Sequence, residues 1–373
     1  MKAVVNAERF SEALKKAGAV LGKAVIPLLE QVRADFTGSV CRLTGTNLDH
    51  WLIAEIPAEG DSFSFIFSNT REIIRLCKYF SGALTLEVTG QAEDESRYKR
   101  NKGYLLEITC GEKGASFPVW DSEDYPVLGD PGELLYCYSV RPAELLRRVK
   151  RIGYAACPSK TRPQSIGVRF QGNRLWCVDG IRLAANTNSN LTVDRPFVLS
   201  KLSLAHLKEF GGESAELRIY QKYAVFSGGG LSLYCRIILS ADAMELEKVV
   251  PKSFISTYSV TRSSFLDALK YLNDCVRDRS KACVLCDRGK LYVLENDRMY
   301  RATVDIQGES FDRHAFRLTF LKEALEQFAG VEEITVHENN AAAPVLFTAG
   351  GADIALLLPV RAYKGWERID AAA

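Results

Sequence analysis

A pattern of helix, strand and second helix occurs three times in this chain of 373 residues. The first helix spaces its apolar residues five and then four positions apart, at Val5, Phe10 and Leu14, at Val140, Leu145 and Val149, and at Val260, Phe265 and Leu269. A strand that ends on a polar residue follows, at 43–47, 175–179 and 291–295. The second helix closes on an aromatic residue and a glycine, at Phe80-Ser81-Gly82, Phe210-Gly211-Gly212 and Phe328-Ala329-Gly330. The copies are much longer than the roughly 20 to 50 residues of a solenoid repeat, so each is predicted to be a domain with its own core.

Two short turn-rich segments separate the copies. They are residues 129–132 (Gly-Asp-Pro-Gly) and 249–253 (Val-Val-Pro-Lys-Ser). We therefore expect domains at residues 1–128, 129–250 and 251–373, with a C-terminal extension from about residue 362. Few helices alternate with many strands in each copy, which favours an α+β fold with two helices packed on antiparallel sheets.

The order of the copies indicates how subunits can assemble. Short joins hold the three like domains in a fixed relation, so we expect a rigid arc. The first copy begins the chain and the third copy ends it, so the third domain of one subunit can meet the first domain of another. If that head-to-tail contact closes, two chains form a ring of six domains, of which one chain is half.

Composition is that of an ordinary soluble globular protein, with 47% hydrophobic and 25% charged residues. No apolar run approaches the about 18 residues that span a bilayer, so no membrane partner is expected. The amino terminus has one basic residue, Lys2, before it turns polar, which is unlike a secretory signal. These features predict a cytoplasmic protein.

The cysteines and histidines give little support to an enzyme. Most of the ten cysteines stand singly in apolar segments, where Cys behaves as a small buried hydrophobe. The close pair Cys283 and Cys286 has no second pair to complete the four ligands of a structural zinc site. A hydrolytic or redox site at His50, Asp49 or these cysteines is an alternative hypothesis, but the four histidines lack catalytic or metal spacing and no phosphate-binding glycine motif is present. We expect no catalytic residue, no metal and no cofactor.

Basic residues gather on the predicted helices, although the net charge is only +2. Helix 141–151 carries five basic residues against one acid, and its apolar residues Leu145, Val149 and Ile152 keep helical spacing. For a single helix, a solvated face is the better interpretation. Because the bias recurs in the first two copies, we favour a shared cationic surface that attracts phosphates without reading sequence. The helices of the third copy show this basic bias less clearly, because acidic residues offset their basic residues.

Five motifs, in order and at approximate spacing, resemble the bacterial DNA polymerase III β sliding clamp family. They are Leu43-Thr44-Gly45-Thr46-Asn47-Leu48, Asp124-Tyr125-Pro126, Val178-Asp179-Gly180-Ile181-Arg182-Leu183-Ala184, Val249-Val250-Pro251-Lys252 and Leu357-Leu358-Pro359-Val360-Arg361. The resemblance implies a ring-shaped homodimer that encircles double-stranded DNA of any sequence and has no enzymatic activity. It further implies three kinds of partner, namely the DNA polymerase III catalytic subunit, the clamp loader and other proteins with a clamp-binding motif.

The resemblance also implies a hydrophobic cleft for a partner peptide between the second and third domains. Carried over to this sequence, its residues are Arg162, Val178, Gly180, Ile181, Arg182, Leu183, Met244, Lys248, Val249, Leu356, Leu358, Pro359, Val360 and Arg361. An apolar groove with a few charged rim groups can anchor the large side chains of a tethered peptide. Without the resemblance, we would interpret the same apolar run as inter-domain core.

Three DNA-binding candidates, Lys23, Arg71 and Lys78, match basic positions of the family, and the others come from the charge pattern. The dimer-interface candidates come from the resemblance alone. The DNA-binding candidates are Lys23, Arg71, Arg75, Lys78, Arg147, Arg148, Lys150, Arg151 and Lys201. The dimer-interface candidates are Phe117, Cys275 and Val276.

The sequence also departs from the family. Ile181 stands where the family commonly has His, Ser165 where Leu is usual and Met244 where a Phe-Pro pair is common. The tail beyond Arg361 carries Tyr363 and Trp366, which either pack over the cleft or stay disordered. An alternative function is that of a clamp-fold paralogue that binds partner peptides without encircling DNA.

Overall fold

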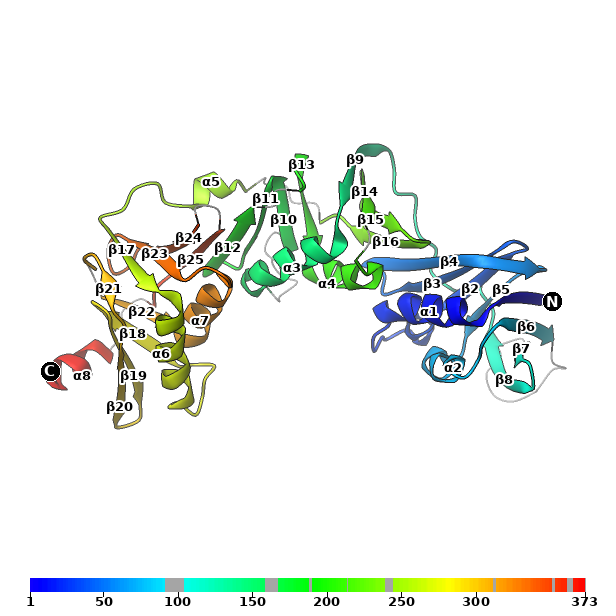
Figure 1. Cartoon of the computed structure of the whole chain (residues 1–373), viewed down its shortest axis with the longest axis horizontal. Coiled ribbons are helices and arrows are strands. Elements are labelled where there is room, and N and C mark those ends of the chain that lie inside the picture. The colour runs from blue at the N-terminus through cyan, green and yellow to red at the C-terminus, as the bar shows by residue number, and fades with distance from the viewer. Residues whose placement is uncertain are drawn as a thin grey trace. The chain divides into compact units, whose positions relative to one another are not determined.

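The computed structural model describes residues 1–90, 104–157, 167–187, 190–212, 214–238, 244–310, 313–350, 353–360 and 365–372 (Figure 1). The chain forms two compact units, one of Met1–Leu146 with Leu202–Ile237 and one of Arg147–Lys201 with Ile238–Ala373. The predicted middle domain, residues 129–250, therefore contributes to both units. The three domain boundaries stay predictions.

The described strands of the first unit form one antiparallel sheet of twelve, in the order β1-β6-β7-β8-β5-β2-β3-β4-β16-β15-β14-β9. These strands are β1 (Lys2–Asn6), β2 (Arg33–Thr37), β3 (Val40–Thr46), β4 (His50–Gly60), β5 (Ser62–Phe67), β6 (Ala83–Gly90), β7 (Tyr104–Cys110), β8 (Lys113–Trp120), β9 (Leu134–Val140), β14 (Ala215–Tyr220), β15 (Tyr223–Gly228) and β16 (Leu231–Arg236). Helices α1 (Ala7–Ala17) and α2 (Thr70–Cys77) pack against each other. The 3₁₀ segments among the described residues of this unit are η1 (Gly18–Val20), η2 (Pro27–Glu30) and η5 (Ala205–Phe210).

The described strands of the second unit form a nine-stranded sheet, β13-β10-β11-β12-β25-β24-β23-β17-β21, and a four-stranded sheet, β20-β19-β18-β22. They are β10 (Gly167–Gly172), β11 (Arg174–Val178), β12 (Arg182–Thr187), β13 (Val193–Ser200), β17 (Ser256–Thr261), β18 (Cys283–Asp287), β19 (Lys290–Glu295), β20 (Arg298–Thr303), β21 (Ile306–Gln307), β22 (His314–Arg317), β23 (Glu333–Glu338), β24 (Val345–Ala349) and β25 (Asp353–Leu357). The helical segments are η3 (Gly153–Ala155), α5 (Leu246–Val249), α6 (Arg262–Asp274), α7 (Leu318–Glu326) and α8 (Gly365–Ala372). The sequence boundary between the units falls within α3 (Pro142–Ile152) and α4 (Lys201–Leu204).

The repeated sequence pattern corresponds to repeated structure. The helical pairs Phe10 and Leu14, Leu145 and Val149, and Phe265 and Leu269 are buried on α1, α3 and α6. The valine that begins each pattern differs from the expectation, because Val5, Val140 and Val260 lie in the strands that precede these helices. A buried side chain there extends the core from the helix onto the adjoining sheet.

The aromatic-glycine closures also repeat. Phe80, Phe210 and Phe328 are buried, and Gly82 and Gly330 have φ values of 80° and 92°. Glycine reaches this left-handed region without steric cost, so it can end the helix and start the next strand within a few residues. In all three copies a strand of the large sheets follows directly, at β6, β14 and β23.

Strands from distant parts of the sequence join the halves of each large sheet. In the first unit β4 pairs antiparallel with β16, with Leu52 opposite Leu233. In the second unit β12 pairs antiparallel with β25, with Leu183 opposite Leu356. The second junction brings the segments of the predicted peptide cleft together.

Candidate partner-peptide cleft and DNA-binding face

The β12–β25 junction places the two main segments of the predicted cleft side by side. Arg182 lies opposite Leu357, and the backbone N–H of Leu358 donates to the carbonyl oxygen of Ile181 at 2.9 Å. Leu358 therefore extends the β25 pairing one residue beyond the strand. These contacts align residues 181–183 with residues 356–358 in one antiparallel register.

An apolar cluster fills the space beside this junction. Leu183 and Leu356 are buried in it together with Trp176, Leu246 and Leu346. Two further predicted cleft residues, Val178 and Val249, are partly buried against the same cluster. Four of the predicted residues thus share one hydrophobic surface contributed by β11, β12, α5 and β25.

The other predicted cleft residues differ in how far they are exposed. Ile181 and Met244 are exposed, with 47% and 38% of their surface accessible. Lys248 is exposed and forms an ion pair with Glu245 at 3.2 Å. Pro359 is buried and Val360 is half-buried. Arg162, Arg361, Ser165 and Tyr363 lie outside the described residues.

A tight turn shapes the β11–β12 hairpin. Gly180 has a φ of 90°, which favours glycine over any residue with a side chain. One carboxylate oxygen of Asp179 accepts from the backbone N–H groups of Ile181 and Arg182, at 2.9 and 2.7 Å. The turn consequently fixes Ile181 at its exposed tip.

Arg182 is held by groups of its own unit. Its guanidinium bonds to Asp179 at 2.8 Å and to Glu323 of α7, and it stacks 3.9 Å above the ring of Phe320. Only 10% of its side chain is exposed. Burial raises the pKa of Glu323, and the charge of Arg182 opposes that shift. Arg182 therefore fastens the β11–β12 hairpin to α7.

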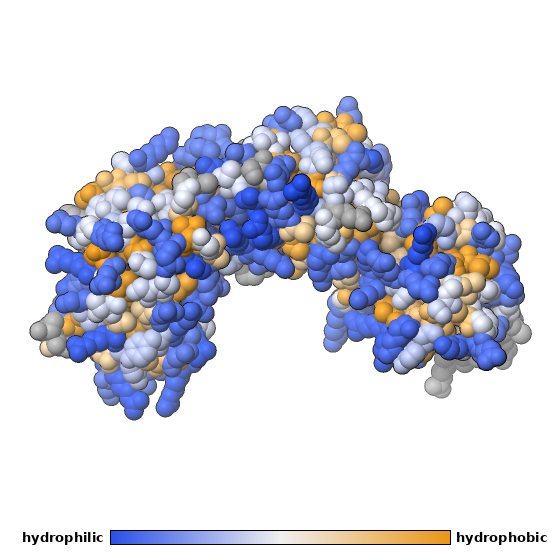
Figure 2. Space-filling view, viewed as in Figure 1, coloured by the Kyte–Doolittle hydropathy of each residue, from blue (hydrophilic) through white to orange (hydrophobic). Residues whose placement is uncertain are grey.

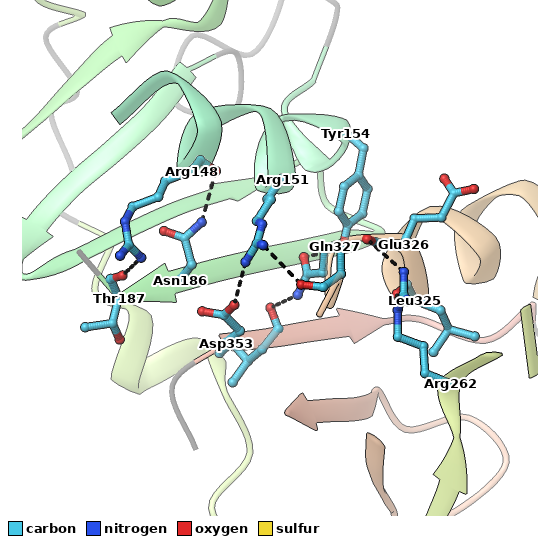
Figure 3. A network of polar contacts seen from close by, with 12 residues as sticks. Arg148, Arg151, Tyr154, Asn186, Thr187, Arg262, Leu325, Glu326, Gln327 and Asp353 are labelled. Carbon is cyan, nitrogen blue, oxygen red and sulfur yellow. Dashed lines mark hydrogen bonds and ion pairs between the residues drawn. The ribbon is translucent and has the colours of Figure 1, made fainter. Parts of the chain in front are cut away.

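Two of the predicted DNA-binding residues on α3 are engaged within the second unit (Figure 3). The guanidinium of Arg148 donates to the carbonyl oxygen of Thr187, and the side chain of Asn186 donates back to the Arg148 carbonyl at 3.0 Å. Arg151 donates to the carbonyl oxygen of Ala329 at 3.1 Å and lies 3.8 Å from the carboxylate of Asp353. These two residues were expected on the solvent side of the helix. They are only half-exposed, because β12 and β25 supply partners for them.

The same network of hydrogen bonds continues through η3 and the end of α7. Tyr154 donates to the side-chain oxygen of Gln327 at 2.9 Å, and Gln327 donates to the carbonyl of Ile354 at 2.8 Å (Figure 3). Burial raises the pKa of Asp353, and Arg151 opposes that shift. The C-terminal half of α3 is thereby fixed to β25 and to the end of α7.

The other predicted basic residues are exposed. Arg147 and Lys150 are the exposed basic residues of α3, and Figure 2 shows hydrophilic residues gathered over this helix. Lys201 is exposed, and its ammonium donates to the carbonyl of Gly153 at 2.7 Å. The predicted DNA-binding residues of the first unit are all exposed, namely Lys23, Arg71, Arg75 and Lys78. Each unit thus carries basic side chains that are accessible to a polyanion.

The predicted dimer residues are mostly buried within their own units. Phe117 and Val276 are 8% and 5% exposed, and Cys275 is half-buried. Phe117 belongs to β8, which pairs with β7 over residues 113–119 but with β5 only at Val119 and Trp120. Among the described strands, residues 113–118 of β8 therefore have a partner on one side only.

A second sheet edge lies near Cys275. β20 pairs with β19 alone among the described strands, and α6 packs against β20. Tyr271 and Met299 are exposed there, at 51% and 38%. Sequence reasoning missed both residues, although an aromatic residue in a polar helix face and the Met299-Tyr300 pair between two arginines were visible signals.

Solved structures of DNA polymerase sliding clamps match this chain over almost its whole length. The clamp of Bacillus subtilis is 20% identical with a TM-score of 0.81, and the DNA polymerase III subunit beta of Pseudomonas aeruginosa is 15% identical with a TM-score of 0.80. A clamp of Bartonella birtlesii bound to griselimycin is 17% identical with a TM-score of 0.79. Each match covers 97% of this chain and 100% of the other. The chain has the sliding-clamp fold. No family model and no curated protein matches its sequence.

The sliding-clamp fold confirms the expected α+β class and the threefold repetition. His50 is buried, it lies 3.2 Å from the hydroxyl of Ser203, and burial lowers its pKa. Burial raises the pKa of Cys283 and raises that of Cys286 to about 12, so neither thiol has the thiolate character of a nucleophile. Within the described ranges, no three His, Cys, Asp or Glu residues gather as a metal site, and no helix is both long and apolar enough to cross a membrane.

Proposed function

We propose that this protein is a DNA sliding clamp, a cytoplasmic ring homodimer without enzymatic activity that encircles duplex DNA and tethers a DNA polymerase and other replication or repair factors. The proposal rests on the match to solved sliding clamps, which covers the whole length of those clamps and 97% of this chain. Topological linkage then confers processivity, since a closed ring stays on DNA without tight binding.

The charge distribution supports DNA encirclement. A clamp that slides needs many weak contacts to phosphates and no base readout. The chain has a net charge of only +2, yet it exposes Lys23, Arg71 and Lys78 in one unit and Arg147 and Lys150 in the other. Arg148 and Arg151 contribute their charge to the field of α3 while their hydrogen bonds fix the helix.

Two sheet edges that lack a partner among the described strands support a head-to-tail dimer. An unpaired edge strand invites pairing with another chain. In the proposed contact β8 of one subunit pairs with β20 of the other, and Tyr271, Cys275 and Met299 supply apolar contacts beside the new ladder. Each subunit contributes both edges, so two such contacts close a ring.

The cluster beside the β12–β25 junction supports a partner-peptide cleft. A buried apolar floor beside the exposed hairpin tip at Ile181 suits a short peptide with one or two large apolar residues. Met244, which is also exposed, remains a candidate for the rim. The proposed partners are the DNA polymerase III catalytic subunit, the clamp loader and other proteins with a clamp-binding motif. Arg162 and Arg361 remain candidates for the charged rim.

Measurement of mass and shape in solution tests the proposal. We expect a particle of twice the 41.5 kDa of one chain, with small-angle scattering that requires a central hole. A compact monomer at micromolar concentration would contradict the ring and would favour a clamp-fold paralogue that binds peptides without encircling DNA.

A further inference from the structure

The chain continues beyond the cleft into a C-terminal helix, α8. Trp366 and Ile369 lie three positions apart and face inward, whereas Glu367, Arg368 and Asp370 are more exposed. This spacing places the two apolar side chains on one face of the helix. The helix is therefore built to lie on an apolar surface.

That surface is the outer face of the four-stranded sheet. Ile369 is 4% exposed and packs with Leu285 of β18 and Ala315 of β22, while Trp366 and Tyr292 pack around them. Figure 1 shows α8 beside the strands of this sheet. The neighbouring strand residues point the other way, because Val284, Val293 and Phe316 belong to the main core of the unit. This alternation is that of a sheet covered on both faces.

Polar contacts fix the position of α8 along the strands. Arg313 bonds to Asp370 at 2.7 Å and to Asp287 at 3.1 Å, and its guanidinium lies 5.3 Å from the ring of Trp366. Arg368 donates to the carbonyl oxygen of Asn296, in the β19–β20 turn, at 2.7 Å. The helix is thus docked in one register.

The segment before α8, Leu358–Val360, which we call the arm, touches both the cleft and the docking surface. At one end, the N–H of Leu358 bonds to the carbonyl of Ile181, at the tip of the β11–β12 hairpin. At the other end, the N–H of Val360 bonds to the carbonyl of Ala315 at 2.7 Å. Val360 and Ala315 also pack in the same apolar cluster as Ile369.

We propose that α8 is an intramolecular brace that holds the arm against β22 and thereby presets one side of the partner-peptide cleft. Two backbone hydrogen bonds contribute little net free energy against the conformational entropy of a free chain end. Docking of α8 keeps that end close to its site, which raises its effective concentration. A preset arm spares the incoming peptide the ordering cost and so raises its affinity. The effect on peptide affinity rests on the proposed function, whereas the effect on the arm does not.

The test compares two substitutions in the full chain that each add one negative charge to α8. Ile369→Asp places the charge in the docked face and should release the helix, whereas Ala371→Asp places it at an exposed position and serves as the matched control. Asp370→Asn weakens docking through Arg313 without burying a charge, so it gives a milder variant if Ile369→Asp folds poorly.

The rate of hydrogen exchange at the Leu358 and Val360 amides measures directly how often the hydrogen bonds of the arm open. We expect exchange at least about tenfold faster in Ile369→Asp, a smaller increase in Asp370→Asn and none in Ala371→Asp. Unchanged exchange at Val360 in both docking variants would overturn the brace, whatever the peptide result.

The effect on the cleft is measured as the Kd of a labelled synthetic peptide. The peptide carries the clamp-binding motif of the same organism's DNA polymerase III catalytic subunit. We expect its Kd to rise about tenfold in Ile369→Asp and to stay unchanged in Ala371→Asp. Faster exchange with an equal or lower Kd would overturn the presetting role. If the unsubstituted protein does not bind the peptide, the peptide cleft of the proposed function fails, and with it the presetting role, while the exchange data still decide the brace.

Discussion

Removal of the Arg182 guanidinium should destabilise the second unit by a measurable and pH-dependent amount. Breaking a fully buried ion pair by removing one partner costs about 3–5 kcal/mol. The side chain of Asp179 is only 10% exposed, like that of Arg182. The side chain of Glu323 is 41% exposed, so water can partly solvate its charge once Arg182 is removed. For Arg182→Ala we therefore expect a loss of about 2–4 kcal/mol in the free energy of unfolding, which includes the lost stacking on Phe320.

The sign of the pH dependence follows from Glu323. Burial already raises its pKa, and the charge of Arg182 opposes that rise. Without Arg182 the pKa rises further above the unfolded value. A carboxyl with a raised folded pKa adds stability as pH falls through that pKa, so the deficit of Arg182→Ala should shrink between about pH 8 and about pH 5.

Urea denaturation followed by circular dichroism at the two pH values measures this effect. Arg279→Ala is the control, because Arg279 pairs with Asp274 at the surface, where both side chains are more than half exposed. The control should change the unfolding free energy by no more than about 1 kcal/mol. A loss below about 1 kcal/mol for Arg182→Ala, or a deficit that grows toward low pH, would refute the assigned role of Arg182.

Three further substitutions test the proposed surfaces. Reversing the charge of both exposed α3 residues, in Arg147→Glu with Lys150→Glu, should weaken DNA binding and lower the slope of log K against log salt by about two, as filter binding at several salt concentrations would show; an unchanged slope would remove α3 from the DNA-binding face. Met299→Glu, at the exposed β20 edge, should shift the protein toward monomer in sedimentation, and an unaltered dimer would exclude this edge from the interface. Ile181→Asp should raise the Kd of a polymerase-derived peptide about tenfold with little change in melting temperature, because the side chain is 47% exposed, and undiminished affinity would place the cleft elsewhere.

Local periodicity predicted the repeated elements well. Phe10 and Leu14, like their counterparts in the other copies, follow helical spacing, and glycine at 82 and 330 ends a helix for a backbone reason that residue type reveals. Such signals depend only on residues close together in the sequence. They can therefore be recognised in one sequence without an alignment.

Features that depend on distant contacts could not be predicted in the same way. The engagement of Arg148 and Arg151 depends on Thr187 and Asp353, which a helical pattern does not reveal. The family resemblance assigned residues 178–183 and 356–361 to one cleft, but it did not predict that β12 pairs with β25. The spacing of Trp366 and Ile369 was visible, but their docking site on β18 and β22 lies far upstream in the chain.

Retention on DNA of defined topology tests the central claim most directly. The protein, loaded by its clamp loader onto nicked circular plasmid, should co-elute with the DNA in gel filtration at moderate salt. A single restriction cut should release it, because a topological link is lost when the ring can slide off an end. Loss of the protein from intact circles at the same rate as from linear DNA would contradict the account.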